Sequence, residues 1–115
     1  MSRNNLALYK KIKVAYADNL KEINPPDLKS GEGVCYILQC ADGSFYVGHT
    51  SEMKKRLTRH NNGEGSVYTK IRRPVSLIYC EVYEDTNLAI QRECQLKGWS
   101  RKKKLALIKN IKMAG

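Results

Sequence analysis

The alternation of apolar and polar positions predicts a small sheet in the middle of the chain. Residues 34–41 (VCYILQCA) form an apolar, partly β-branched run that is typical of a buried strand. Asp42-Gly43 predicts a hairpin turn, and residues 44–48 a returning strand that closes at Gly48. Residues 75–83 (VSLIYCEVY) alternate and predict a third strand.

Helical spacing begins after the second strand. Met53, Leu57 and His60 fall on one face of a predicted helix, for which Thr50 or Ser51 is the expected N-cap. An asparagine- and glycine-rich segment ends this helix, and a basic loop (TKIRRP) then leads to the third strand.

Two further helices follow the third strand. Residues 85–87 (DTN) cap a predicted helix over 88–98 that ends at Gly98. Ser100 caps another over 101–112. The predicted fold class is α/β of the α+β type: a three-stranded, mostly antiparallel sheet flanked by helices, with the site on one face.

The N-terminal third reads as an appendage to this domain. Residues 5–23 carry an apolar stripe that predicts a helix, and the segment NPPD ends it. We therefore divide the chain into an N-terminal helix and linker (1–33) and one domain (34–112). The stripe has to be buried, and packing on the same chain, as a monomer, is favoured over a second copy.

Composition fits a cytoplasmic protein. No apolar run approaches the length of a membrane span, and the N-terminus lacks the apolar core of a signal peptide. The four cysteines contain no CxxC pair, so buried free thiols are expected rather than a zinc site.

The charge predicts a polyanionic partner. The net charge is +10, and the basic residues cluster: residues 49–74 hold seven Lys and Arg against two acids, and residues 95–115 hold seven against none. Clustering of this kind favours nucleic acid over a membrane, whereas charge that serves only solubility need not cluster.

Three polar groupings are candidates for chemistry. Glu93 shares a helical stripe with apolar residues, which indicates a carboxylate that binds a cation or is paired with a Lys or Arg. Arg56 and His60 lie four residues apart on a partly apolar face, an arrangement suited to a phosphate or, equally, to a packed His beside a surface Arg. Tyr36 and Tyr46 lie on the two hairpin strands, where tyrosines are also common for packing alone.

Together these residues resemble a known pattern. Val34-Cys35-Tyr36 and, ten residues on from Tyr to Tyr, Tyr46-Val47-Gly48 are similar to the two signature triplets of the GIY-YIG nucleases. The stretch after Gly48, then Glu93 and LKGWSRKKKLALI, resembles small stand-alone bacterial members related to the nuclease domain at the start of UvrC. The resemblance spans about residues 34–110. The first triplet departs from it, with Val34 and Cys35 in place of Gly and Ile.

The resemblance implies a metal-dependent endonuclease that hydrolyses phosphodiester bonds in DNA. Tyr36 resembles the general base, Tyr46 its partner on the water or phosphate, Arg56 the arginine that stabilises the phosphate charge, and His60 a histidine that supports the base. Glu93 resembles the protein ligand of one Mg²⁺ or Mn²⁺ ion, and Gly48 a glycine that lets the backbone turn under the site.

The basic clusters have an expected role beside this site. They are predicted to grip backbone phosphates without reading sequence, which favours recognition of DNA shape in repair or processing. RNA remains an alternative substrate, and a non-catalytic nucleic-acid-binding protein of the same fold an alternative function. The residues predicted to contact DNA are Lys70, Arg72, Arg73, Arg101, Lys102, Lys103 and Lys104.

Overall fold

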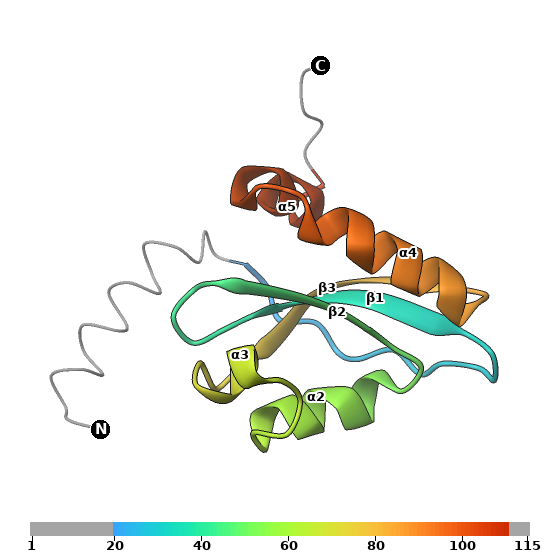
Figure 1. The fold of residues 1–115 in the computed structure, drawn as a ribbon, viewed down its shortest axis with the longest axis horizontal. Coiled ribbons are helices and arrows are strands. Elements are labelled where there is room, and N and C mark those ends of the chain that lie inside the picture. Colours follow the sequence, from blue (N-terminus) through green and yellow to red (C-terminus); the bar gives the residue numbers. More distant parts are fainter. Residues whose placement is uncertain (1–19, 111–115) are drawn as a thin grey trace, which may run out of the picture.

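The computed structural model describes residues 20–110 and has one sheet with helices on both faces (Figure 1). In chain order its elements are β1 (Gly33–Gln39), β2 (Phe45–Thr50), α2 (Met53–Asn61), α3 (Val67–Lys70), β3 (Ser76–Tyr83), α4 (Thr86–Lys97) and α5 (Arg101–Ile108). The predicted fold class and all three predicted strands are confirmed.

The sheet has the strand order β2-β1-β3, and β1 pairs antiparallel with both neighbours. Strand β1 is the central strand and is buried along its whole length, which explains why its sequence is apolar up to Gln39. The predicted hairpin turn joins β1 to β2. Gly43 adopts a φ of 87° there, and its N–H donates to the Cys40 carbonyl at 2.9 Å.

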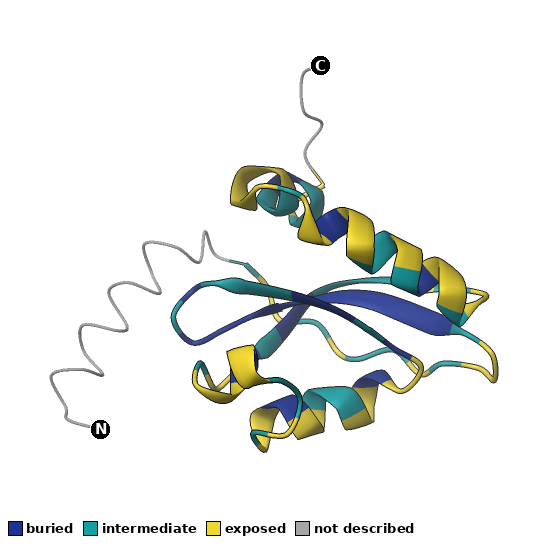
Figure 2. Ribbon diagram, viewed as in Figure 1, coloured by how far each residue is buried: buried dark blue, intermediate teal, exposed yellow. Residues whose placement is uncertain are grey.

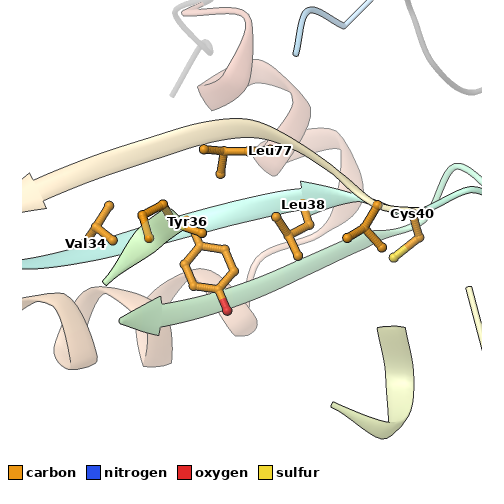
Figure 3. Packing of buried hydrophobic residues seen from close by; sticks show 7 residues of the cluster. Val34, Tyr36, Leu38, Cys40 and Leu77 are labelled. Carbon is orange, nitrogen blue, oxygen red and sulfur yellow. The ribbon is translucent and has the colours of Figure 1, made fainter. Parts of the chain in front are cut away.

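The two faces of β1, which is buried along its length (Figure 2), build two cores. Val34, Tyr36 and Leu38 point to the face covered by α2, where they pack with Met53 and Leu77 (Figure 3). Cys35 and Ile37 point the other way and pack with residues of β2, α4 and α5. The period of two along a strand thus assigns successive side chains to opposite layers.

Several predicted boundaries are wrong. Helix α2 is preceded by Glu52 without a side-chain cap, because the Thr50 hydroxyl accepts from the Glu52 N–H just before the helix begins. Helix α5 ends at Ile108, and Asn110 has a φ of 56°, a left-handed conformation that a continuing helix would not allow. Ser100 is the N-cap of α5, as predicted.

The N-terminal prediction is wrong where the structure describes it. Residues 20–23 are not helical, because the Ile23 N–H donates to the Leu77 carbonyl at 2.9 Å. Ile23 and Leu28 pack on the α2 side of the sheet and Leu20 on the other. The rest of the predicted N-terminal helix, residues 5–19, lies outside the described residues.

Two compositional predictions have different outcomes. Over residues 20–110, no helix is both long and apolar enough to cross a membrane. All four cysteines are free thiols, but only Cys35 and Cys40 are buried. Cys94 is exposed because it lies on the outer side of α4, contrary to the expectation of burial.

Candidate active site

A buried hydrogen bond joins the first candidate tyrosine to the candidate histidine. The Tyr36 hydroxyl on β1 lies 2.8 Å from Nε2 of His60 in the last turn of α2. Tyr36 is 1% exposed and His60 is fully buried. Both groups are therefore held in one geometry and shielded from bulk water.

The other ring nitrogen of His60 is bonded as well. Nδ1 lies 2.8 Å from the hydroxyl of Thr69, which is also fully buried. That hydroxyl is directed toward the Ser66 carbonyl at 3.4 Å and lies 2.9 Å from the Ser66 hydroxyl. When the Thr69 hydroxyl donates its hydrogen bond to Ser66, its oxygen accepts a hydrogen bond from His60 Nδ1–H. The other ring nitrogen, Nε2, then accepts a hydrogen bond from the Tyr36 hydroxyl.

Helix α3 holds Thr69 in this position. Ser66 is its N-cap, and the Ser66 hydroxyl accepts from the Thr69 N–H at 3.0 Å. The segment from Thr69 onward was predicted to be a basic loop, so this helix was not predicted. A four-residue helix with one buried polar side chain has no apolar periodicity by which to find it.

Burial shifts the pKa of both members of the pair. Desolvation and, to a smaller extent, the nearby Arg56 charge together lower the pKa of His60 to about 4, so the imidazole is neutral at pH 7. Desolvation also raises the pKa of Tyr36 well above its usual value, assisted by Tyr46. Arg56 acts against this rise through its charge and its approach to the hydroxyl.

Two glycines allow this close packing. A Cβ on Gly48 would lie 2.5 Å from the Tyr36 hydroxyl and ring carbon Cζ, and a Cβ on Gly65 would lie 2.1 Å from His60 Nδ1. The expectation that Gly48 provides a backbone turn is wrong. Strand β2 continues through it to Thr50, and the tyrosine ring occupies the space of its missing side chain.

Tyr46 lies beside the buried pair on the same face. Its ring centroid is 6.4 Å from that of Tyr36 and 5.1 Å from that of His60. In the β1–β2 register, Tyr46 is opposite Leu38 and Gly48 is opposite Tyr36. The two tyrosines are therefore diagonal neighbours on the two strands, and the Tyr36 ring lies over Gly48, which has no side chain in the way.

Glu93 lies on α4 with its side chain 13% exposed. Its Oε1 is 3.0 Å from His49 Nδ1, and its Oε2 is 3.2 Å from Lys97 Nζ. The paired-carboxylate interpretation of Glu93 thus has a structural basis. Within residues 20–110, no group of three His, Cys, Asp or Glu side chains is arranged to hold a metal ion.

The candidate residues come from both layers of the sheet. Tyr36, Tyr46 and His60 lie with α2, whereas Glu93 and the pairing residue His49 lie with α4. The charge of Glu93 is one of the smaller causes that raise the pKa of Tyr36, after burial and Tyr46. Because α4 packs on the opposite face from α2, the candidate residues do not all lie on one face of the sheet, contrary to the expectation.

The basic residues on α3 and its following loop are held by specific contacts. Arg72 pairs with Asp42 at 3.2 Å and lies 3.8 Å from the centroid of the Tyr68 ring. Arg73 donates to the carbonyls of Lys70 and Asn61, at 2.8 and 3.3 Å. Lys70 is exposed.

The basic residues of α5 differ from one another. Arg101 donates to the Gly43 carbonyl at 2.9 Å and lies over the ring of Phe45. Lys103 lies over the ring of Trp99, Lys104 is half-buried, and Lys102 is exposed. Arg101 therefore ties α5 to the β1–β2 hairpin, and the lysines differ in how freely they face solvent.

Four residues of the site were missed by sequence reasoning: His49, Gly65, Thr69 and Lys97. His49 directly follows the second triplet, and Lys97 is four residues from Glu93, so both had a positional signal. Gly65 and Thr69 had none, because their roles depend on the fold bringing them to His60.

Comparison with known proteins matches this chain to a family. The model of the GIY-YIG catalytic domain matches residues 32–106. A UPF0213 protein of Staphylococcus saprophyticus is 51% identical over 73 residues, which cover 64% of this chain and 89% of the relative. A UPF0213 protein of Staphylococcus aureus is 49% identical over 74 residues, 64% of this chain and 90% of the relative. The solution NMR structure of the protein EF2693 from E. faecalis is 40% identical, covers 74% of this chain and 90% of that chain, and has a TM-score of 0.53.

Proposed function

This chain belongs to the GIY-YIG catalytic domain family of nucleases, and from that premise we propose that it is an endonuclease that hydrolyses phosphodiester bonds in DNA. The observation that carries the proposal is the buried Tyr36–His60 hydrogen bond, with His60 fixed in turn by Thr69. We assign the protein to DNA repair or processing, with selection by DNA shape.

Tyr36 and His60 work together as the general base in this proposal. A free tyrosinate is scarce at neutral pH, because burial raises the pKa of Tyr36. The hydroxyl instead takes a proton from the attacking water while its own proton passes to Nε2 of His60, 2.8 Å away. The Thr69 hydroxyl accepts a hydrogen bond from His60 Nδ1–H, which keeps the ring proton on Nδ1 and leaves Nε2 open as the acceptor.

Substrate binding strengthens this base. The Arg56 charge is one cause of the lowered pKa of His60, and desolvation is the larger one. A bound phosphate diester places a negative charge against Arg56 and offsets its effect on the imidazole. The basicity of His60 thus rises when the scissile phosphate is in place, and Arg56 stabilises the charge that develops on that phosphate.

Glu93 fits the role of sole carboxylate ligand for one Mg²⁺ or Mn²⁺ ion. Its Oε2 lies 3.2 Å from the ammonium of Lys97, which is 55% exposed and able to swing away. When bound, such an ion would neutralise phosphate charge and assist the leaving oxygen. His49 holds the Glu93 carboxylate in orientation through Oε1.

The basic residues of α3, its following loop and α5 hold the DNA backbone on either side. Lys70 and Lys102 are exposed, and Lys103 and Lys104 project from the same α5 helix. Contacts of this type supply affinity that is independent of sequence and sensitive to salt. The selectivity we propose therefore comes from the shape of the DNA at the site.

The test is a cleavage assay with the purified full chain and Mg²⁺ or Mn²⁺ on branched, nicked and linear DNA, with RNA of matched shape beside them. We expect metal-dependent cutting of DNA that a chelator abolishes. Glu93→Gln, prepared identically, controls for contaminating nucleases. Tight binding to every substrate without cutting by the parent would contradict the proposal and support the non-catalytic alternative.

A further inference from the structure

An open groove crosses the outer edge of strand β2. It has a volume of about 230 Å³ and is lined by Phe45, Tyr46, Val47, Tyr68, Lys97 and Lys104. These residues come from β2, α3, α4 and α5, so the groove joins the two helical layers around the edge of the sheet. Its volume is below the range typical of pockets for drug-sized ligands, and it suits a smaller flat group.

Aromatic rings form one wall of the groove. The rings of Tyr46 and Tyr68 are stacked, with centroids 6.1 Å apart and planes inclined by 28°. Tyr68 is 37% exposed, and the Arg72 guanidinium lies against its ring at 3.8 Å. Arg72 is itself held by Asp42 and by the Tyr68 carbonyl, so the ring is fixed in an exposed position.

Cationic side chains also line the groove. Lys97 and Lys104 line the groove, and Arg101 lies beside it, over the ring of Phe45. Burial and the Arg101 charge lower the pKa of Lys104, so an anion beside it would be favoured. A groove with aromatic and cationic walls fits a base and its adjoining phosphate.

We propose that this groove binds one unpaired nucleotide of the substrate strand, with its base against Tyr46 and Tyr68 and its phosphate between Lys97 and Lys104. The inference rests on the proposed nuclease function, because Tyr46 belongs to both the groove and the candidate site. A base within a duplex is stacked on its neighbours and paired with the opposite strand, so it cannot enter the groove. The groove therefore selects substrates with an unpaired strand next to the cut.

A peptide is the rival occupant. Among residues 20–110, no strand pairs with the outer edge of β2, and such an edge can accept an added strand. The stacked tyrosine rings and the nearby cations favour a nucleotide, since a base stacks on a ring whatever its sequence. The continuity of the groove with Tyr46 also places the nucleotide beside the bond to be cut.

The experiment measures binding separately from cutting. A labelled oligothymidine strand, the matching oligouridine and a DNA hairpin duplex of equal length are titrated with the full chain in the presence of EDTA. Tyr68→Ala removes the exposed ring, Tyr68→Trp restores stacking, and Ile71→Ala is the control, because Ile71 is 74% exposed nearby but does not line the groove. Lys104→Ala removes a cation that lines the groove, and it is compared with Lys102→Ala, which removes an exposed cation of the same helix that does not line it.

We expect Tyr68→Ala to weaken single-strand binding on the order of 5- to 150-fold, the range for loss of one stacking ring, with duplex binding within about twofold of the parent. Tyr68→Trp and Ile71→Ala should bind as the parent does. Lys104→Ala should weaken single-strand binding more than Lys102→Ala. Equal losses for strand and duplex, no loss at all, or displacement of the strand by an acidic peptide at matched charge would each overturn the inference.

The outcome separates the subsite from the proposed function. A parent that binds single strands through Tyr68 but never cuts would contradict the nuclease proposal and leave the nucleotide subsite supported. A parent that cuts DNA while Tyr68→Ala binds and cuts as the parent does would leave the nuclease proposal supported and overturn the subsite.

Discussion

Thr69→Val tests the hydrogen-bond relay behind the proposed base. Valine keeps nearly the same shape in a site that is fully buried, but it removes the hydroxyl 2.8 Å from His60 Nδ1. Water cannot replace that partner without a rearrangement. An unsatisfied buried N–H costs about 1–3 kcal/mol. The protein can avoid the cost by moving the ring proton to Nε2, but His60 then donates to Tyr36 and can no longer accept its proton.

The penalty has two measurable forms. If the proton stays on Nδ1, the free energy of unfolding falls by about 1–3 kcal/mol. If the proton moves to Nε2, the cleavage rate falls on the order of 5- to 150-fold. This factor is the same cost of about 1–3 kcal/mol, now expressed as the lower population of the tautomer that can accept the Tyr36 proton. Urea unfolding measures the first, single-turnover cleavage the second, and ring-nitrogen NMR of His60 reports the tautomer directly.

Two matched variants accompany this measurement. Thr69→Ser keeps the hydroxyl and should retain the parental tautomer and rate, with a stability loss of about 1 kcal/mol for the missing methyl group. Thr58→Val removes an exposed hydroxyl that donates to the Lys54 carbonyl of its own helix, and should change neither readout appreciably. Parental rate, stability and tautomer in Thr69→Val would refute the relay.

Three other changes have distinct expected results. Glu93→Gln should abolish metal-dependent cutting. The free energy of unfolding should fall by less than about 1 kcal/mol, since the Lys97 partner of Glu93 is largely exposed. A large drop in melting temperature with cutting intact would mean that the carboxylate is structural. Gly48→Ala should lower stability and activity, because its Cβ would lie 2.5 Å from the Tyr36 hydroxyl. Gly98→Ala is the control, since among residues 20–110 its Cβ would meet only the Gln95 carbonyl, at 3.5 Å; equal melting temperatures of the two variants would contradict the close packing. Acid should destabilise the protein through His60, whose pKa is 6.5 in the unfolded state and about 4 in the folded state. Between these values only the unfolded state takes up a proton, so the free energy of unfolding falls as the pH drops, by on the order of 2 kcal/mol between pH 7 and pH 5. His60→Gln should lose less stability over the same range, and equal losses would contradict the shift.

The sequence was sufficient for the parts of the fold that depend on local pattern. The apolar run of β1, the Asp42-Gly43 turn and the Ser100 cap each have a strong local signal, and each was predicted correctly. The candidate residues Tyr36 and His60 were also found from spacing and resemblance. Their direct hydrogen bond was not, because it joins residues 24 apart in the chain.

The errors have a common physical cause. Residues 20–23 continue a helical apolar stripe, but the Ile23 N–H bonds to β3 instead, so a tertiary contact overrides the local pattern. Gly48 was explained by backbone freedom, whereas the space for the Tyr36 ring requires it. Thr69 looks like any polar loop residue in the sequence, and only the fold brings its hydroxyl to a buried imidazole.

The most direct test of the central claim is single-turnover cleavage by Tyr36→Phe across a range of pH. The change keeps the buried ring and removes only the hydroxyl 2.8 Å from His60. The account predicts a normally folded protein whose rate falls on the order of 100-fold or more, the size of a general-base contribution, and recovers partly as hydroxide replaces the base at high pH. A folded Tyr36→Phe protein that cuts DNA at the parental rate would contradict it.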